Sequence, residues 1–203
     1  MIDIVATFIV FFAVIDPIGT VPVFIAVTRG FSASDKRHIA FIATLTSALI
    51  LIFFVIAGEL ILNALSIPLS AFQISGGLVL FIFALSMIFG ESKPEEETRI
   101  AEKRTETAVY PLSVPSIAGP GAMLTAVLMT ERATFDLWQQ FQTVLVMLSV
   151  LGLTCVLMLL ASGVQRLIGN AGAIVISRVM GLILASVATA NTLNGIRVYF
   201  GIG

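Results

Sequence analysis

Charged and chemically reactive side chains are scarce in this sequence of 203 residues. Only 11% of the residues are charged, against about 25% in a typical soluble domain. There is one histidine, His38, and one cysteine, Cys155. An internal disulfide is therefore excluded, and no cluster of His, Cys and carboxylate residues has metal-ligand spacing. The net charge of −1 offers no basic surface for nucleic acid, and we expect no cofactor.

Apolar residues take the place of the missing charge. They make up 58% of the chain and give a mean hydropathy of +1.08, which is more than a soluble core of this length can bury, so we expect a membrane protein. A helical span needs about 20 apolar residues, and isolated strands would leave backbone groups unpaired in lipid. Six stretches are predicted to be transmembrane helices: Ile4–Thr28, Ile39–Asn63, Ser70–Gly90, Ala108–Thr130, Leu137–Gly163 and Ile174–Phe200.

One polar segment divides the chain near its middle. Residues 91–107 contain ten charged residues, which indicates a solvated loop between a first three-helix repeat at 1–90 and a second at 108–203. Nine of the eleven Lys and Arg residues fall in the first, third and fifth connections. Because basic residues concentrate on the cytoplasmic side, these connections are predicted to be cytoplasmic and both termini to lie outside.

Proline and glycine interrupt the first and fourth stretches near their centres. Residues 16–22 read DPIGTVP and residues 115–121 read PSIAGPG, and both patterns should break a helix. Three helices per half make the halves antiparallel, and GLVL at Gly77–Leu80 matches GLIL at Gly181–Leu184. We therefore predict an all-α membrane protein with six transmembrane helices in two inverted three-helix repeats, with helices 1 and 4 discontinuous.

The two interruptions should face each other, because broken backbone at mid-membrane depth is tolerated only against protein or a watery cavity. The second half-helices should begin near Thr20, as a cap, and near Pro120, at a permitted first-turn position. Helix starts offer unpaired N–H groups and roughly half a positive charge, so two converging starts favour a carboxylate ligand. The candidate substrate-binding residues are Asp16, Pro17, Gly19, Thr20, Pro22, Ser116, Gly119, Pro120, Gly121, Asn191 and Asn194.

Two parts of this candidate site have more than one interpretation. Asp16 is the one acidic residue near the middle of a predicted span. It could receive a substrate ammonium group, a coupling cation or a proton, or it could cap the second half-helix. Asn191 and Asn194 share a face of the sixth helix, where they could line the cavity or form interhelical hydrogen bonds.

The same segments resemble a known family. DPIGTVPVF at Asp16–Phe24, PLSVPSIAGPG at Pro111–Gly121, SRVMG at Ser177–Gly181 and ISGG at Ile74–Gly77 are similar to the signatures of the MarC (UPF0056) family, whose relatives include the neutral amino acid transporter SnatA. The resemblance covers essentially the whole chain. It implies a six-helix protein of the bacterial inner membrane, small neutral amino acids such as glycine or alanine as substrates, and substrate binding by the backbone around Gly19 and Gly119–Gly121.

These observations favour a secondary transporter over an enzyme. The sequence has no HExxH or GxSxG pattern and no second intramembrane aspartate to pair with Asp16, so hydrolysis within the membrane lacks its usual groups. It also has no GxxxxGK[ST] loop, so pumping would draw on a proton, sodium or substrate gradient. The expected partners are the bilayer and a small zwitterionic substrate. The alternatives are a channel, which can also use broken helices, and a non-transporting helper protein.

Overall fold

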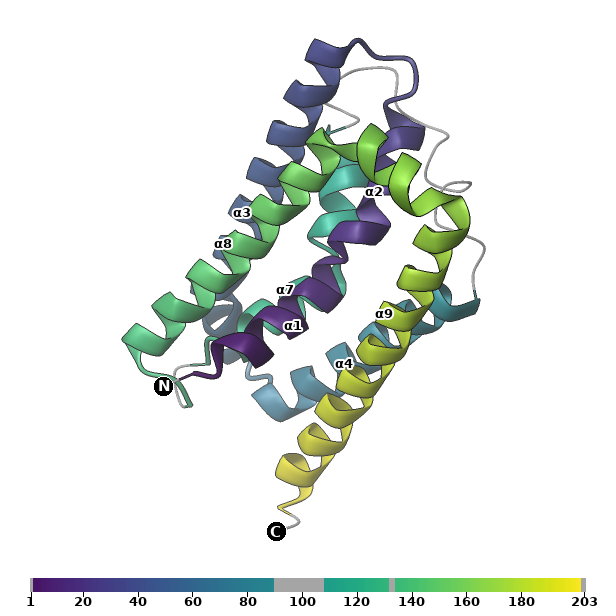
Figure 1. Ribbon diagram of the computed structural model, residues 1–203. Helices are drawn as coiled ribbons and strands as arrows, with labels where there is room; N and C mark the ends of the chain where they lie inside the picture. Colours follow the sequence, from purple (N-terminus) through teal and green to yellow (C-terminus); the bar gives the residue numbers. More distant parts are fainter. Residues whose placement is uncertain (1, 90–107, 132–133, 202–203) are drawn as a thin grey trace.

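Helices make up the ordered architecture of the chain in the computed structural model, which describes residues 2–89, 108–131 and 134–201. The predicted charged loop at 91–107 and Arg132 lie outside the described residues. No strand occurs in the described ranges, and the prediction of an all-α protein is confirmed. The elements, drawn in Figure 1, are α1 (Ile4–Ile15), α2 (Pro17–Val27), α3 (Ala33–Ala64), α4 (Leu69–Phe89), the π-helical η1 (Ala108–Ile117), α7 (Pro120–Leu128), α8 (Leu137–Leu159) and α9 (Ala161–Phe200).

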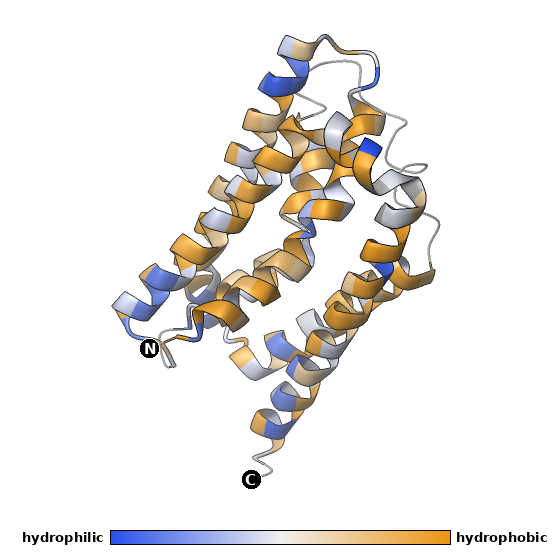
Figure 2. Ribbon diagram, in the orientation of Figure 1, coloured by the Kyte–Doolittle hydropathy of each residue, from blue (hydrophilic) through white to orange (hydrophobic). Residues whose placement is uncertain are grey.

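Five helical segments of the described chain are long and apolar enough to cross a membrane: Ile4–Val27, Ala33–Ala64, Leu69–Phe89, Leu137–Leu159 and Ile174–Phe200. The fourth predicted span, Ala108–Thr130, is instead divided between η1 and α7, and neither piece reaches membrane length by itself. Hydrophobic colour covers the middles of the long helices in Figure 2, and hydrophilic colour gathers at their ends.

The outer surface of α3 explains why a bilayer is needed. Large apolar side chains recur every three or four residues along this helix and are exposed, which places them in one outward stripe. Contiguous apolar surface of this extent marks contact with lipid or another protein. The stripe consists of Leu45, Leu49, Phe53, Ile56 and Leu60.

Three helix boundaries differ clearly from the predicted spans. Helix α3 begins at Ala33 rather than Ile39, because the Ser32 hydroxyl accepts a hydrogen bond from the backbone N–H of Asp35 (3.2 Å) and caps a charged first turn. Helix α8 ends at Leu159, and α9 starts at Ala161, well before the predicted Ile174. Gly169 interrupts α9 with φ 68° and ψ 172°, a conformation open essentially to glycine alone. Hydropathy marks the membrane-embedded part of a helix and misses its polar extensions.

The broken helices occupy the interior. In Figure 1, α1, α2 and α7 lie between α3 and α8 on one side and α4 and α9 on the other. Within its most apolar window, 61% of Ile4–Val27 is buried, against 18–44% in the other four candidate spans. Helix α1 packs against α7, and α2 packs against η1. The first broken helix therefore runs alongside the second, and both pack against the long helices.

Glycines allow α4 and α9 to approach each other closely over much of their length. A Cβ atom added to Gly77 would lie 3.0 Å from the carbonyl oxygen of Ala188 and would overlap the side chain of Thr192. A Cβ atom added to Gly181 would lie 3.1 Å from the carbonyl oxygen of Ala84 and 2.9 Å from Ile88. Each glycine thus admits the backbone of the opposite helix, which only a residue without a side chain can do.

Candidate functional site

The first helix break is made by a single residue, Asp16. Its backbone is left-handed (φ 49°, ψ 65°), and its N–H donates to the carbonyl of Phe12 (3.0 Å), which closes α1. Aspartate is one of the few residues that adopt this conformation at modest cost, since its short side chain bonds locally. Pro17 then occupies the first position of α2, where its missing N–H is not needed.

The carboxylate of Asp16 caps α2. Its Oδ1 accepts a hydrogen bond from the N–H of Gly19 (2.9 Å), and the residue is only 1% exposed. Thr20, predicted to be the cap, lies inside α2, and its hydroxyl donates to the carbonyl of Asp16 (3.0 Å). The prediction for Thr20 was therefore wrong, because the aspartate one turn earlier reaches the helix start first and carries the charge that the helix start favours.

Gly19 and Pro22 shape the first turns of α2. A Cβ atom at Gly19 would overlap the carboxylate of Asp16, so glycine is required for the cap to lie against the backbone. Pro22 lies inside α2 and has no N–H to donate to the carbonyl of Ile18, one turn earlier. The carbonyl of Ile18, two residues after Asp16, is therefore without its usual helical partner.

The second break is longer and is made by three prolines. Each residue that precedes a proline takes an extended backbone conformation: Tyr110 (φ −130°, ψ 127°), Val114 (φ −129°, ψ 122°) and Gly119 (φ −76°, ψ 171°). The proline ring excludes the helical region for the residue before it, which accounts for the irregular path of η1. Helix α7 then starts with Pro120 at its first position, as predicted.

The start of α7 is not capped by any side chain in the described part of the chain. Gly119 occupies the cap position and has no side chain, and Pro120 supplies no N–H. Ser116, three residues before the cap, is 2% exposed, and its hydroxyl has no hydrogen-bond partner among the described residues. Thr125, inside α7, is 3% exposed and is in the same state.

Several other buried hydroxyl groups do find partners. Those of Thr20, Thr28, Ser47, Thr130 and Thr154 each donate to the carbonyl four residues earlier. Ser113, three residues before Ser116, approaches the carbonyl oxygens of Ala43 (2.9 Å) and Ala108 (2.8 Å). An unpartnered buried hydroxyl is costly, by about 1–3 kcal/mol, so Ser116 and Thr125 indicate a ligand or water site.

The two breaks lie close together. A Cβ atom at Gly121 would lie 4.0 Å from Cγ1 of Val14, two residues before the first break, and would overlap the side chain of Leu80. Next to the start of α7, a pocket of about 260 Å³ lies between α3, α4 and α7, and Pro120, Phe72 and Ser75 are among its lining residues. Gly121 in the second interruption thus lies near Val14, just before the first, with Leu80 packed against it. The described residues that line the pocket include none from the first break, so a cavity shared by both breaks stays a prediction.

The two asparagines of α9 that were predicted to line the site differ in their burial. Asn191 is half-buried and precedes Thr192, which packs against Gly77 of α4, whereas Asn194 is exposed. Sequence reasoning also missed Thr125 as a candidate. A threonine in the second turn after a proline–glycine break was the available signal.

The fold and its apolar outer face define an integral, multi-pass membrane protein. The chain belongs to the MarC family: residues 1–200 match the family described as MarC family integral membrane protein. It is 34% identical over 189 residues to the UPF0056 membrane protein MJ1677 of Methanocaldococcus jannaschii, with 92% of each chain covered. It is 32% identical over 199 residues to the UPF0056 inner membrane protein YhgN of Escherichia coli K12, with 98% of each chain covered.

A third relative, a UPF0056 membrane protein of Archaeoglobus fulgidus, is 30% identical over 194 residues, which cover 94% of this chain and 91% of the relative. These names state that the relatives are membrane proteins, and one of them an inner membrane protein, but they specify no activity. No solved structure gives a significant match to the chain.

Proposed function

We propose that the chain is a secondary transporter for small neutral amino acids such as glycine or alanine, and not an enzyme. The observation that carries this function is the start of α7, where no described side chain caps the helix and the buried Ser116 hydroxyl has no described partner. A helix start of this kind binds anions through its N–H groups and its positive dipole end. The substrate carboxylate binds there.

The first break binds the other charged group of the substrate, its ammonium group. Because the Asp16 carboxylate already occupies the start of α2, only α7 remains to bind the substrate carboxylate. The substrate ammonium group lies toward Asp16 and the carbonyl of Ile18. Opposite charges at the two adjacent breaks match a zwitterion, and the close packing of Leu80 against Gly121 favours a substrate with a small side chain. A proton or a sodium ion couples transport through the same carboxylate.

The proposed architecture is six spans in two inverted repeats, and helix packing supports it. An exchange of the halves maps α1 onto η1, α2 onto α7, α3 onto α8 and α4 onto α9. Under this exchange, the contact between α1 and α7 corresponds to the contact between η1 and α2. The contact between α3 and η1 corresponds to the contact between α8 and α1. All four contacts are present.

The residue contacts between α4 and α9 follow the same exchange. Gly77 faces Ala188 and Thr192, and Gly181, which is 104 residues further along, faces Ala84 and Ile88. The partners are related by the same offset of 104, which is the pattern that a two-fold axis produces. Repeats of this kind permit alternating access by rocking of one half against the other.

The proposed orientation places both termini outside the cytoplasm, in a cytoplasmic membrane. The excess of Lys and Arg in alternate connections supports it, and the E. coli relative is named an inner membrane protein. A reporter enzyme that works only in the cytoplasm can be fused to either terminus. Activity of that fusion would contradict this orientation.

Reconstitution of the purified protein into liposomes tests the function. We expect saturable uptake of labelled glycine or alanine, accumulation driven by a proton or a sodium gradient, and competition by the unlabelled amino acid. Ser116→Ala should raise KM about tenfold or more, because a hydrogen bond to a charged group contributes about 1.5–3 kcal/mol.

Thr154→Ala is the matched control. Its hydroxyl is equally buried but donates to the carbonyl of Val150 (2.9 Å) within α8, so the variant should transport as the wild type does. Flux that rises linearly with concentration and never accumulates would indicate a channel. If Ser116→Ala and Thr154→Ala had the same KM, the start of α7 would not be the binding site of the substrate carboxylate.

A further inference from the structure

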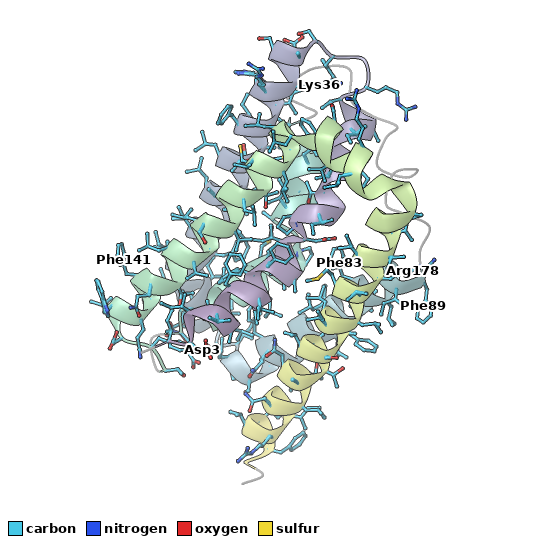
Figure 3. All side chains as sticks on the ribbon, viewed as in Figure 1. Asp3, Lys36, Phe83, Phe89, Phe141 and Arg178 are labelled. Carbon is cyan, nitrogen blue, oxygen red and sulfur yellow. The ribbon has the colours of Figure 1, made fainter. Side chains whose placement is uncertain are left out.

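A second pocket, of about 390 Å³, lies at the end of α2 away from the first break, where α2 and α8 end and α3 and α9 begin. Three cationic side chains line it, Lys36 and Arg37 from the first turns of α3 and Arg166 from the first turns of α9. None of the described residues that line it is acidic. Figure 3 shows Lys36 at the end of the molecule opposite Asp3.

The other side of this basic pocket is apolar. Phe24 and Met158, from the last turns of α2 and α8, are lining residues that are 3% and 1% exposed. The hydroxyl-bearing Ser162 also lines the pocket. The pocket thus joins a positively charged rim to an apolar floor, and it therefore suits a ligand that is anionic at one end and hydrocarbon at the other.

The pocket also lies at the level of a membrane surface. Two candidate spans end beside it, at Val27 and Leu159, and a third begins beside it at Ala33. The helix segment that carries Arg166 also carries Leu167, which is 88% exposed, as expected for a side chain inserted among lipids. Lipid headgroups and not bulk solvent are the nearest source of a ligand at this level.

We propose that the basic pocket binds the phosphate headgroup of an anionic phospholipid from the adjacent leaflet, with an acyl chain on the apolar floor. Basic pockets between transmembrane helices bind anionic headgroups through charge-assisted hydrogen bonds to phosphate. Arg37 and Arg166 contribute planar donors that match phosphate geometry, and Lys36 contributes a point charge. This site is separate from the proposed transport site and does not depend on it.

Native mass spectrometry of the purified full-length protein in a neutral detergent tests the site. Phosphatidylglycerol and phosphatidylcholine with identical acyl chains are added separately, and bound lipids are counted. We expect phosphatidylglycerol to bind at least tenfold more tightly, because each nearby Lys or Arg contributes about fivefold. Arg166→Gln should weaken that binding about fivefold, and Lys36→Gln, Arg37→Gln and Arg166→Gln together should remove the preference.

Arg178→Gln is the matched control. Arg178 is exposed on the same helix, does not line the pocket and lies away from Lys36 in Figure 3, so its loss should leave the preference unchanged. Arg166→Lys should retain most of the binding. Equal binding of the two lipids, an equal loss in Arg178→Gln, or displacement of the lipid by an equal concentration of glycerol phosphate would each overturn the proposal.

Discussion

The two helix breaks differ in what meets the start of the second half-helix. At the first break, the Asp16 carboxylate accepts the N–H of Gly19 (2.9 Å) and lies against its backbone. At the second, the cap position is Gly119, no described side chain caps α7, and the nearby Ser116 hydroxyl has no described partner. The same physical requirement, a negative partner for a helix start, is met by a described side chain at the first break only.

In the proposed function, this difference gives the adjacent breaks complementary roles. A break that carries its own carboxylate is closed to a second anion and attracts a cation. A break with an open helix start attracts an anion. In the proposed function the two together bind a zwitterion, which a symmetric pair of identical breaks would not.

The largest expected effect comes from filling the second break. Gly121→Leu places a side chain where even a Cβ atom overlaps Leu80, so we expect transport of glycine in proteoliposomes to fall below detection. Gly152→Leu is the matched control, because a Cβ atom there meets nothing within 4 Å.

Membrane insertion and size-exclusion profiles of both leucine variants separate a blocked site from a misfolded protein. If Gly121→Leu is poorly folded, Gly121→Ala combined with Leu80→Ala provides the room that the added methyl group needs. Normal transport by a well-folded Gly121→Leu protein would rule out the second break as the binding site.

The next effect separates the two roles of Asp16. Asp16→Asn keeps a side chain that caps α2 and tolerates the left-handed conformation, so thermal stability in detergent should change little. The loss of charge should lower kcat/KM for glycine at least tenfold, because a charged partner for the ammonium is removed.

Asp16→Val removes the cap and places a β-branched residue at φ 49°, which should cost about 2–3 kcal/mol of stability. Transport by Asp16→Asn at the wild-type rate would show that the carboxylate acts as a cap alone.

A smaller effect concerns two serines of η1 that differ in their partners. Ser113→Ala loses hydrogen bonds to the carbonyls of Ala43 and Ala108 and should be destabilised by about 1 kcal/mol. Ser116→Ala removes a hydroxyl without a described partner and should be as stable as the wild type or more so. Thermal unfolding of the substrate-free protein checks both, and equal losses would mean that Ser116 is bonded in the native state.

The sequence predicted the family, the helical class and the positions of both breaks, because prolines and glycines act locally on the backbone. It did not predict which residue caps each half-helix. Asp16 and Thr20 are both good caps, and only the left-handed turn at Asp16 decides between them. The extra helical turns before Ile39 and Ile174 were missed, because capping by Ser32 and a glycine kink at Gly169 leave no trace in hydropathy.

The partners of individual hydroxyl groups also could not be predicted. Ser113 and Ser116 are three residues apart in one segment, yet only Ser113 meets the carbonyl of Ala43, 70 residues away. Such a contact depends on how α3 packs against η1, and periodicity within one helix carries no information about it. The candidate site was therefore predictable as a region, and its division into a capped and an uncapped break was not.

The smallest expected effect tests how far the site extends onto α9. Asn191 is half-buried and Asn194 is exposed, so we expect substitutions of these two predicted site residues to differ in their effect on transport. We expect Asn191→Ala to raise KM for glycine about threefold, through a weakened neutral hydrogen bond of about 0.5–1 kcal/mol, and Asn194→Ala to leave it within twofold. Initial uptake rates over a range of glycine concentrations measure both. A larger effect at Asn194 would place the zwitterion on the outer side of α9, away from the two breaks.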